Sequence, residues 1–113
     1  MPVWKTKPVS QQPEITLINW SIIEVDGKER HFCGYCVENA EGRVSSAIAQ
    51  FDAKTLKGVT RSGRCYRLDG PPGFNFDAAY VWDVWSRINK VTSARDVSAE
   101  VAIGKHPQGR TAC

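Results

Sequence analysis

The chain has 113 residues, of which 42% are hydrophobic and 24% are charged, and its formal net charge is +3 at pH 7. This composition is typical of one folded domain and excludes a disordered, collagen-like or membrane-spanning chain. The positive charge is smaller than that of a dedicated nucleic-acid-binding domain.

The N-terminal segment, residues 1–14, contains Pro2, Pro8 and Pro13 and few apolar residues, so an extended or mobile arm is predicted. The segment lacks the apolar region of a secretory signal, which favours the cytoplasm and reduced thiols. A single domain is expected over residues 15–103. Residues 104–113 are polar, with proline and glycine, and are expected to form a loose C-terminal tail.

Four strands are predicted in the first part of the domain. Residues 15–25 are rich in β-branched side chains and end at Asp26-Gly27, a dipeptide that favours a tight hairpin turn. Residues 31–38 and 44–51 fit two further strands, separated by the turn-forming residues 39–42. Residues 59–68 fit a fourth strand, in which Gly63 marks a bulge. Short turns between successive strands indicate an antiparallel meander.

An amphipathic helix is predicted after the Pro-Pro turn, from about residue 78 to residue 90. Asp77 is the expected N-cap, with Phe76 and Val81 spaced as a hydrophobic staple. Apolar residues including Trp82 and Trp85 recur on one side, which predicts that this side packs on the sheet.

Residues 97–103 alternate between apolar and polar or small side chains, which favours a fifth strand, with a short helix as the alternative. The predicted fold is therefore α+β: a mainly antiparallel four- to five-stranded meander with one amphipathic helix packed across one face.

A basic segment provides the candidate binding residues. Arg61, Arg64 and Arg67 lie close to Tyr66, and on a bulged strand all of them would reach solvent together. Guanidinium groups beside an aromatic ring suit phosphate or single-stranded nucleic acid. The alternative is a charged strand edge that prevents pairing with other sheets. Trp4, in the N-terminal arm, is a further candidate anchor for a partner or for the domain's own surface.

Cys33 and Cys36 form a CxxC pair, which raises the possibility of a metal site. A second ligand pair is missing, and the odd spacing on a strand directs the two thiols to opposite faces. The favoured interpretation is that both are small core residues, and no metal or cofactor is predicted. His31 and His106 carry no local catalytic signature, so an enzyme is the less favoured class.

The first predicted strand has apolar residues on both of its faces, with Ile15, Leu17, Ile23 and Val25 on one and Ile18, Trp20 and Ile22 on the other. One helix covers one face of a sheet. A homodimer that buries the second face is therefore a candidate assembly.

The segments GRVSSAIAQFD, TRSGRCYRLDGPPG and AAYVWDVWSRIN resemble short bacterial proteins encoded on mobile DNA, such as plasmids, phage-like islands and integron gene cassettes. The resemblance spans about residues 20–96, and Cys33, Cys36 and Cys65 are not part of its pattern. It implies no activity, cofactor or catalytic residue.

These observations favour a small non-catalytic binding or interaction module with a protein partner. One alternative is a small-molecule-binding protein or small enzyme with its pocket between helix and sheet. The other is a weak nucleic-acid binder that uses the basic strand. A membrane partner is not expected.

Overall fold

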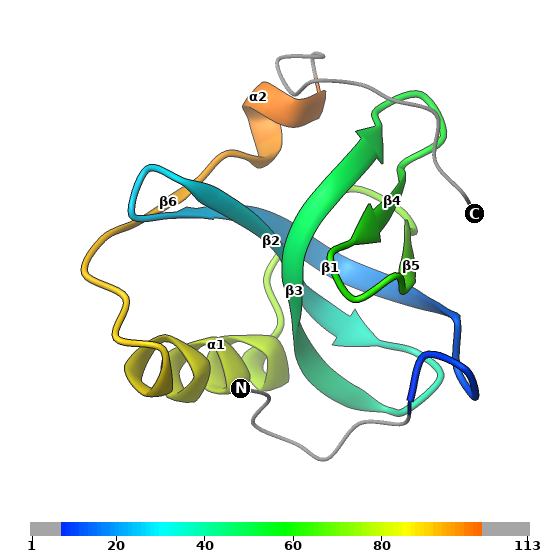
Figure 1. Cartoon of the computed structure of the whole chain (residues 1–113), viewed down its shortest axis with the longest axis horizontal. Coiled ribbons are helices and arrows are strands. Elements are labelled where there is room, and N and C mark those ends of the chain that lie inside the picture. Colours follow the sequence, from blue (N-terminus) through cyan, green and yellow to red (C-terminus); the bar gives the residue numbers. More distant parts are fainter. Residues whose placement is uncertain (1–7, 103–113) are drawn as a thin grey trace.

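A computed structural model of the chain describes residues 8–102. Predictions on residues 1–7 and 103–113, including the one on Trp4, lie outside the described residues. No helix between residues 8 and 102 is long and apolar enough to cross a membrane. The elements in chain order are β1 (Glu14–Val25), β2 (Glu29–Cys36), β3 (Glu41–Asp52), β4 (Lys57–Thr60), β5 (Cys65–Leu68), α1 (Phe76–Ile88), β6 (Ala94–Asp96) and α2 (Ser98–Ala102) (Figure 1).

The first five strands close into a small barrel. Their order is β2-β3-β4-β5-β1, and β1 also pairs with β2, so the sheet returns to its starting strand. Consecutive strands are antiparallel, and β1 and β5 are parallel because a five-stranded meander ends in the direction in which it began. The short strand β6 adds to the second half of β1. The α+β class and the mainly antiparallel sheet are confirmed, but the sheet has six strands and the described chain has two helices.

A bulge in the middle of β1 determines how this strand fills the core. Between Ile18 and Ser21 the register with β2 shifts by one residue, and Asn19 has a φ of 46°. The extra residue reverses the alternation of side chains. Ile15 and Leu17 before the bulge and Trp20 and Ile22 after it therefore all belong to one buried core, with the other members Phe32, Cys36, Phe51, Tyr66, Leu68 and Val97.

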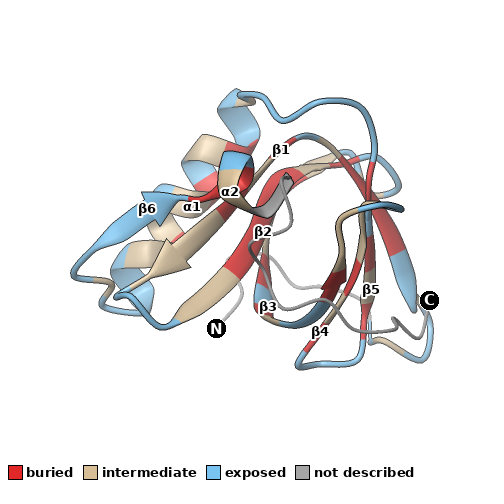
Figure 2. Ribbon diagram, turned by 90° about the horizontal axis from the view of Figure 1, so that it is seen from above, coloured by how far each residue is buried: buried red, intermediate tan, exposed pale blue. Residues whose placement is uncertain are grey.

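The prediction of a second, uncovered apolar face on the first strand is therefore wrong for Ile15 and Leu17, because the chain itself already covers both side chains. Figure 2 shows buried positions along the barrel strands and on the side of α1 that faces them.

The predicted single strand over residues 59–68 is two strands. A tight turn joins β4 to β5, in which the amide of Gly63 donates to the carbonyl of Thr60 (2.8 Å) and the amide of Thr60 donates to the carbonyl of Arg64 (3.1 Å). Gly63 has a φ of +91°, a conformation that glycine adopts without strain. The chain reverses at this glycine, whereas a bulge would only bend it.

Helix α1 packs on β3 and β2, on the outer side of the barrel. Its N-cap is Asn75, whose side-chain oxygen accepts from the amide of Ala78 (2.9 Å), so the prediction of Asp77 as the cap is wrong. Both side chains have a suitable acceptor, and the helix begins two residues earlier than expected. Its buried side is formed by Ala78, Val81 and Trp85.

The prediction of a strand over residues 97–103 is also wrong, and the alternative of a short helix is observed. The Asp96 carboxylate accepts from the amide (2.8 Å) and the hydroxyl (2.6 Å) of Ser98 at the start of α2. Val97 is fully buried, and its amide donates to the carbonyl of Ile22 (2.8 Å). This connection fastens the end of the described chain to the middle of β1.

Candidate functional site

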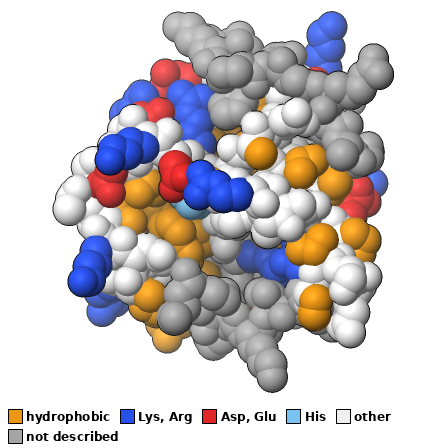
Figure 3. Space-filling view, viewed as in Figure 1, with side chains coloured by type: hydrophobic (Ala, Val, Ile, Leu, Met, Phe, Trp, Pro, Cys, Tyr) orange, Lys and Arg blue, Asp and Glu red, His pale blue; other side chains and the backbone are white. Residues whose placement is uncertain are grey.

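A pocket of about 400 Å³ lies where β3, the β4–β5 turn and α1 come together. Three arginines line it, and we call it the arginine pocket. Its lining residues are Glu29, His31, Arg43, Val44, Ser45, Ser46, Ala47, Arg61, Ser62, Arg64, Tyr66, Trp85 and Asn89. Figure 3 shows an acidic and a basic side chain crossing over the histidine on this face, beside hydrophobic side chains.

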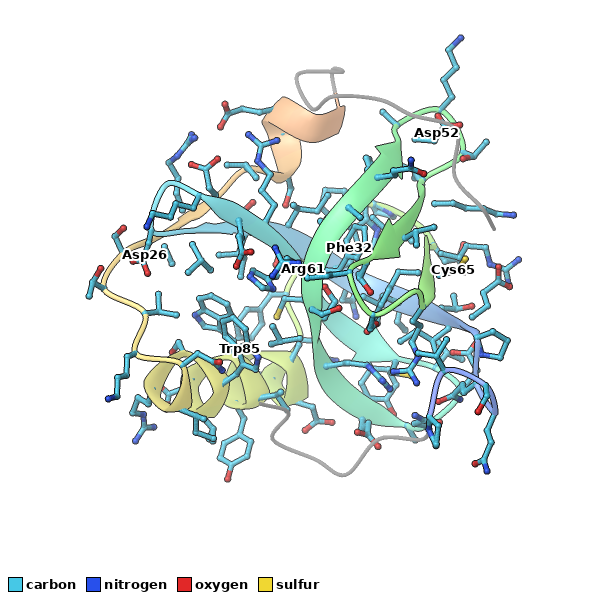
Figure 4. The ribbon with its side chains drawn as sticks, in the orientation of Figure 1. Asp26, Phe32, Asp52, Arg61, Cys65 and Trp85 are labelled. Atoms are coloured by element: carbon cyan, nitrogen blue, oxygen red, sulfur yellow. The ribbon has the colours of Figure 1, made fainter. Side chains whose placement is uncertain are left out.

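Arg61 and Arg64 hold different positions because they occupy the two ends of the β4–β5 turn. Arg61 is exposed and forms an ion pair with Glu29 of β2. Arg64 is only 5% exposed, and its Nε donates to the carbonyl of Gln12 (2.9 Å). That bond fastens part of the predicted N-terminal arm to the barrel. Figure 4 shows Arg61 over the centre of the sheet, on the side of β3 where Trp85 of α1 lies.

Arg43 is the least expected side chain of the pocket. It lies on β3 and is only 4% exposed. Its Nη1 is buried and makes no hydrogen bond, and within residues 8–102 the guanidinium forms no ion pair. Burial raises the pKa of the Cys36 thiol, while the positive charge of nearby Arg43 opposes that rise. Cys36, a neighbour of this guanidinium, is thus a neutral thiol and does not balance its charge.

His31 lines the pocket next to α1. Its ring packs edge-on against Trp85 with the centroids 4.8 Å apart, and its Nδ1 lies 2.8 Å from the carbonyl oxygen of Ser45. Because a carbonyl only accepts, Nδ1 carries the proton and Nε2 is an acceptor in the neutral ring. Burial lowers the pKa of His31 below its ordinary value of 6.5, so the ring is neutral at pH 7.

Serine hydroxyl groups form part of the pocket lining. Ser46 Oγ donates to Ser62 Oγ (3.3 Å), and Ser62 Oγ lies 3.0 Å from Thr60 Oγ1. Hydroxyls rotate readily and both donate and accept. Together with the guanidinium groups they provide donors for an anionic ligand.

Three of the predicted site residues, Arg61, Arg64 and Tyr66, line this pocket, and Arg67 does not. The expectation that the three arginines and Tyr66 reach solvent together is wrong. Arg64 and Tyr66 are 5% and 3% exposed, and Tyr66 packs in the core against Phe32, whereas Arg67 is exposed on another side. The cause is the turn between β4 and β5, which sends Arg61 and Arg64 in different directions.

Sequence reasoning missed Arg43. The available signal was a charged residue inside a predicted strand. The apolar residues of that strand do not keep to one face, which predicts that both of its faces are covered. A charged side chain in such a strand has to be buried with a partner or to serve a ligand.

Cys33 and Cys36 are both free and buried, and they face opposite sides of β2. The Cys33 thiol donates to the carbonyl of Ala78 in α1 (3.7 Å), whereas Cys36 belongs to the barrel core. Burial raises the pKa of Cys33 to about 12. Among the residues that the structure describes, no three potential metal ligands come together.

A second surface feature is a group of exposed aromatic rings before and along α1. Phe74, Phe76 and Tyr80 are 66%, 81% and 58% exposed, and the rings of Phe74 and Phe76 pack edge-on at 5.0 Å. Exposed aromatic rings are common at protein interfaces.

Comparisons with protein-family models, curated proteins and solved structures give no match for this chain. Its function has to be argued from the geometry of these surfaces.

Proposed function

We propose that this chain is a small non-catalytic binding protein and that its ligand is a small anionic molecule held in the arginine pocket. The observation that carries the proposal is Arg43, a buried guanidinium with an unpaired Nη1 on the wall of a pocket of about 400 Å³. This volume lies in the range of pockets that bind small molecules, roughly 300 to 1,000 Å³.

The energetics of Arg43 support a ligand. An unsatisfied buried donor costs about 1 to 3 kcal/mol, and more when it is charged. An apolar side chain of similar length would avoid this cost and is often neutral or stabilising in place of a buried charge. An anion that accepts from Nη1 after a rotation of the guanidinium removes the penalty and makes a charge-assisted hydrogen bond.

Ligand binding to the folded state raises its stability by mass action, so a thermal shift assay tests the proposal. Phosphate, sulfate and citrate are titrated against the parent and against Arg43→Met. We expect the melting temperature of the parent to rise with at least one anion and that of Arg43→Met to stay constant. Arg43→Met removes an unpaired charge and keeps the length of the side chain, so it should fold.

The matched control is Arg87→Met. Arg87 pairs with Asp83 on the exposed side of α1 and does not line the pocket. This variant should keep the full response to the anion. If Arg43→Met responds as strongly as the parent, the pocket is not the binding site and the proposal fails.

The second candidate is a protein-binding surface formed by Phe74, Phe76 and Tyr80, favoured by their large exposed fractions. Its occupant would be a protein partner or a second copy of the chain. Sedimentation at tens of micromolar tests the homodimer. A dimer that dissociates in Phe76→Ser supports it, and a monomeric parent contradicts it.

Nucleic-acid binding through the basic strand has less support, because Arg64 is buried and Arg67 does not line the pocket with Arg61. A cytoplasmic protein encoded on mobile DNA remains a proposal that rests on composition and on the sequence resemblance.

A further inference from the structure

Two small pockets flank the first half of α1, and they share no lining residue with the arginine pocket. The first, which we call the small apolar pocket, has a volume of about 160 Å³. The second, which we call the acidic pocket, has a volume of about 210 Å³. Both volumes lie below the range of roughly 300 to 1,000 Å³ that is usual for small-molecule sites. Each pocket is therefore suited to a single side chain of a partner.

The small apolar pocket lies between α1 and the second half of β1. Its apolar lining comes from Ile23, Cys33, Phe74, Ala78, Ala79 and Trp82. The Trp82 ring stacks on that of Trp85 with the centroids 5.4 Å apart, so this wall is in place before a partner binds. A cavity of about 150 Å³ with apolar walls holds a benzene ring. The small apolar pocket therefore matches one aromatic side chain.

The acidic pocket lies on the other side of α1, against the start of β3. Its described lining contains two carboxylates, those of Glu41 and Asp77, and no Lys, Arg or His. Within residues 8–102 neither carboxylate forms an ion pair. Ala40 and Val81 form an apolar wall beside them. A Lys or Arg side chain fits this combination, because it lays its apolar stem on such a wall and keeps its charge near the carboxylates.

Exposed aromatic rings connect the two pockets. Phe74 lines the small apolar pocket, and its ring packs against that of Phe76, which is 81% exposed. Tyr80 lines the acidic pocket. A free molecule of the size of one ring would leave the Phe76 ring in water, whereas a protein segment that crosses α1 covers it. The surface therefore favours a protein partner with one anchoring side chain in each pocket.

The width of α1 sets the spacing of the two anchors. Ala78, Ala79 and Trp82 line one pocket, and Asp77, Tyr80 and Val81 line the other. At about 3.6 residues per turn, these two sets lie roughly half a turn apart around the helix axis. A helix with its side chains is about 10 to 12 Å wide, and an extended chain advances about 3.4 Å per residue. In an extended segment the two anchors are therefore about three to four residues apart.

We propose that the partner is an extended protein segment with an aromatic side chain in the small apolar pocket and a Lys or Arg side chain in the acidic pocket, about three to four residues away. This inference rests on the second candidate function, because it assigns a partner chemistry to the same aromatic surface, and it is independent of the arginine pocket. The two carboxylates of the acidic pocket carry the choice of a basic partner.

Selection of peptides from a random phage-display library on the intact chain tests the inference. The selected peptides are synthesised with a fluorescent label and titrated by anisotropy. We expect them to share an aromatic residue and a Lys or Arg residue about three to four positions apart. Their affinity should fall about threefold between about 0.1 and 1 M salt, because salt screens charges at the surface. A library that yields no such peptides contradicts the inference.

Two variants test the pockets separately. Ala79→Leu fills the small apolar pocket with a good helix former and should weaken binding at least about tenfold, whereas Ala79→Ser leaves the pocket open and should bind as the parent does. The double variant Glu41→Gln, Asp77→Asn removes both charges of the acidic pocket. It should weaken binding about fivefold and remove most of the salt dependence.

The matched control for the double variant is Glu14→Gln, Asp52→Asn. Glu14 begins β1 and Asp52 ends β3, and neither residue lines either pocket. Figure 4 shows Asp52 at the end of β3 that is remote from α1. This control loses the same two kinds of carboxylate and should keep the affinity and the salt dependence of the parent.

Phe76→Ser separates this inference from the second candidate function. If the peptides lose binding in Phe76→Ser but bind Ala79→Leu and the double variant as tightly as the parent, the partner chemistry is wrong and the protein-binding surface stands. If they bind Phe76→Ser as tightly as the parent, the surface itself is wrong and the inference fails with it. A parent that sediments as a dimer and dissociates in Phe76→Ser makes a second copy the occupant and contradicts the inference.

Discussion

The contact between β3 and the start of α1 leaves no room for a side chain at Gly42. A Cβ placed on Gly42 lies 2.3 Å from the carbonyl oxygen of Asp77, 2.4 Å from its carbonyl carbon and 2.6 Å from the amide nitrogen of Ala78. All three are backbone atoms, so no side-chain rotation relieves the overlap. We therefore expect Gly42→Ala to separate the helix from the sheet.

The size of the effect follows from these distances. Non-bonded heavy atoms rest at about 3.5 to 4.0 Å, so the first turn of α1 has to retreat by more than about 1 Å. Ala78 is buried there, and its carbonyl accepts from the Cys33 thiol. Overpacking a core typically costs 1 to 3 kcal/mol. Because backbone has to move, we expect a loss of about 3 kcal/mol in the free energy of unfolding, or about 10 to 15 °C in melting temperature.

Urea unfolding followed by tryptophan fluorescence and circular dichroism measures this loss. The matched control is Gly73→Ala, whose new Cβ meets only Asn19, with its nearest atom, the side-chain oxygen, at 3.3 Å. The control should stay within about 0.5 kcal/mol of the parent. If Gly42→Ala is equally stable, α1 does not press on β3 as closely as the structure shows, and the reasoning is refuted.

Three further predictions concern the bulge, the buried histidine and the buried thiols. Asn19→Val should lower the free energy of unfolding by about 1 to 2 kcal/mol, because a β-branched residue resists positive φ, whereas Asn19→Gly should be tolerated; equal urea midpoints would contradict this. The lowered pKa of His31 means that the unfolded chain binds more protons below pH 6.5, so the urea midpoint should fall as the pH drops from about 7 to 5. His31→Gln should reduce that slope, and an unchanged slope would count against a buried neutral ring. Because burial raises the pKa of Cys33 to about 12 and also raises that of Cys36, iodoacetamide at pH 8 should label both only in denaturant, as mass spectrometry would show; rapid labelling of the native protein would contradict their burial.

Local signals predicted the elements whose chemistry lies in a few adjacent residues. Asp26-Gly27 forms the first turn with positive φ at both residues, as the dipeptide indicated. The periodicity of residues 78–90 predicted the helix and the burial of Trp85. Its first residue was missed because Asn75 and Asp77 are both good caps, and propensity does not choose between them.

The errors concern features that depend on distant contacts. A single extra residue at Asn19 cannot be seen in a strand whose apolar residues occupy both odd and even positions, yet it decides which side chains enter the barrel. Gly63 fits both a bulge and a turn, and the pairing of β4 with β5 decides between them. The arginine pocket combines residues from β2, β3, the β4–β5 turn and α1, so neither its existence nor the burial of Arg43 follows from any one segment.

The closure of the barrel by β1 also sets the order in which the protein can fold during synthesis. The hydroxyl of Ser98 accepts a hydrogen bond from the amide of Ile22 only after 76 further residues have been added, and β5 reaches the first half of β1 late as well. At about 5 to 20 residues per second, the ribosome needs about 4 to 15 s to add those residues. During this time β1 has its β2 hairpin partner but not its other neighbours, so its apolar residues remain open to chaperones or to other nascent chains.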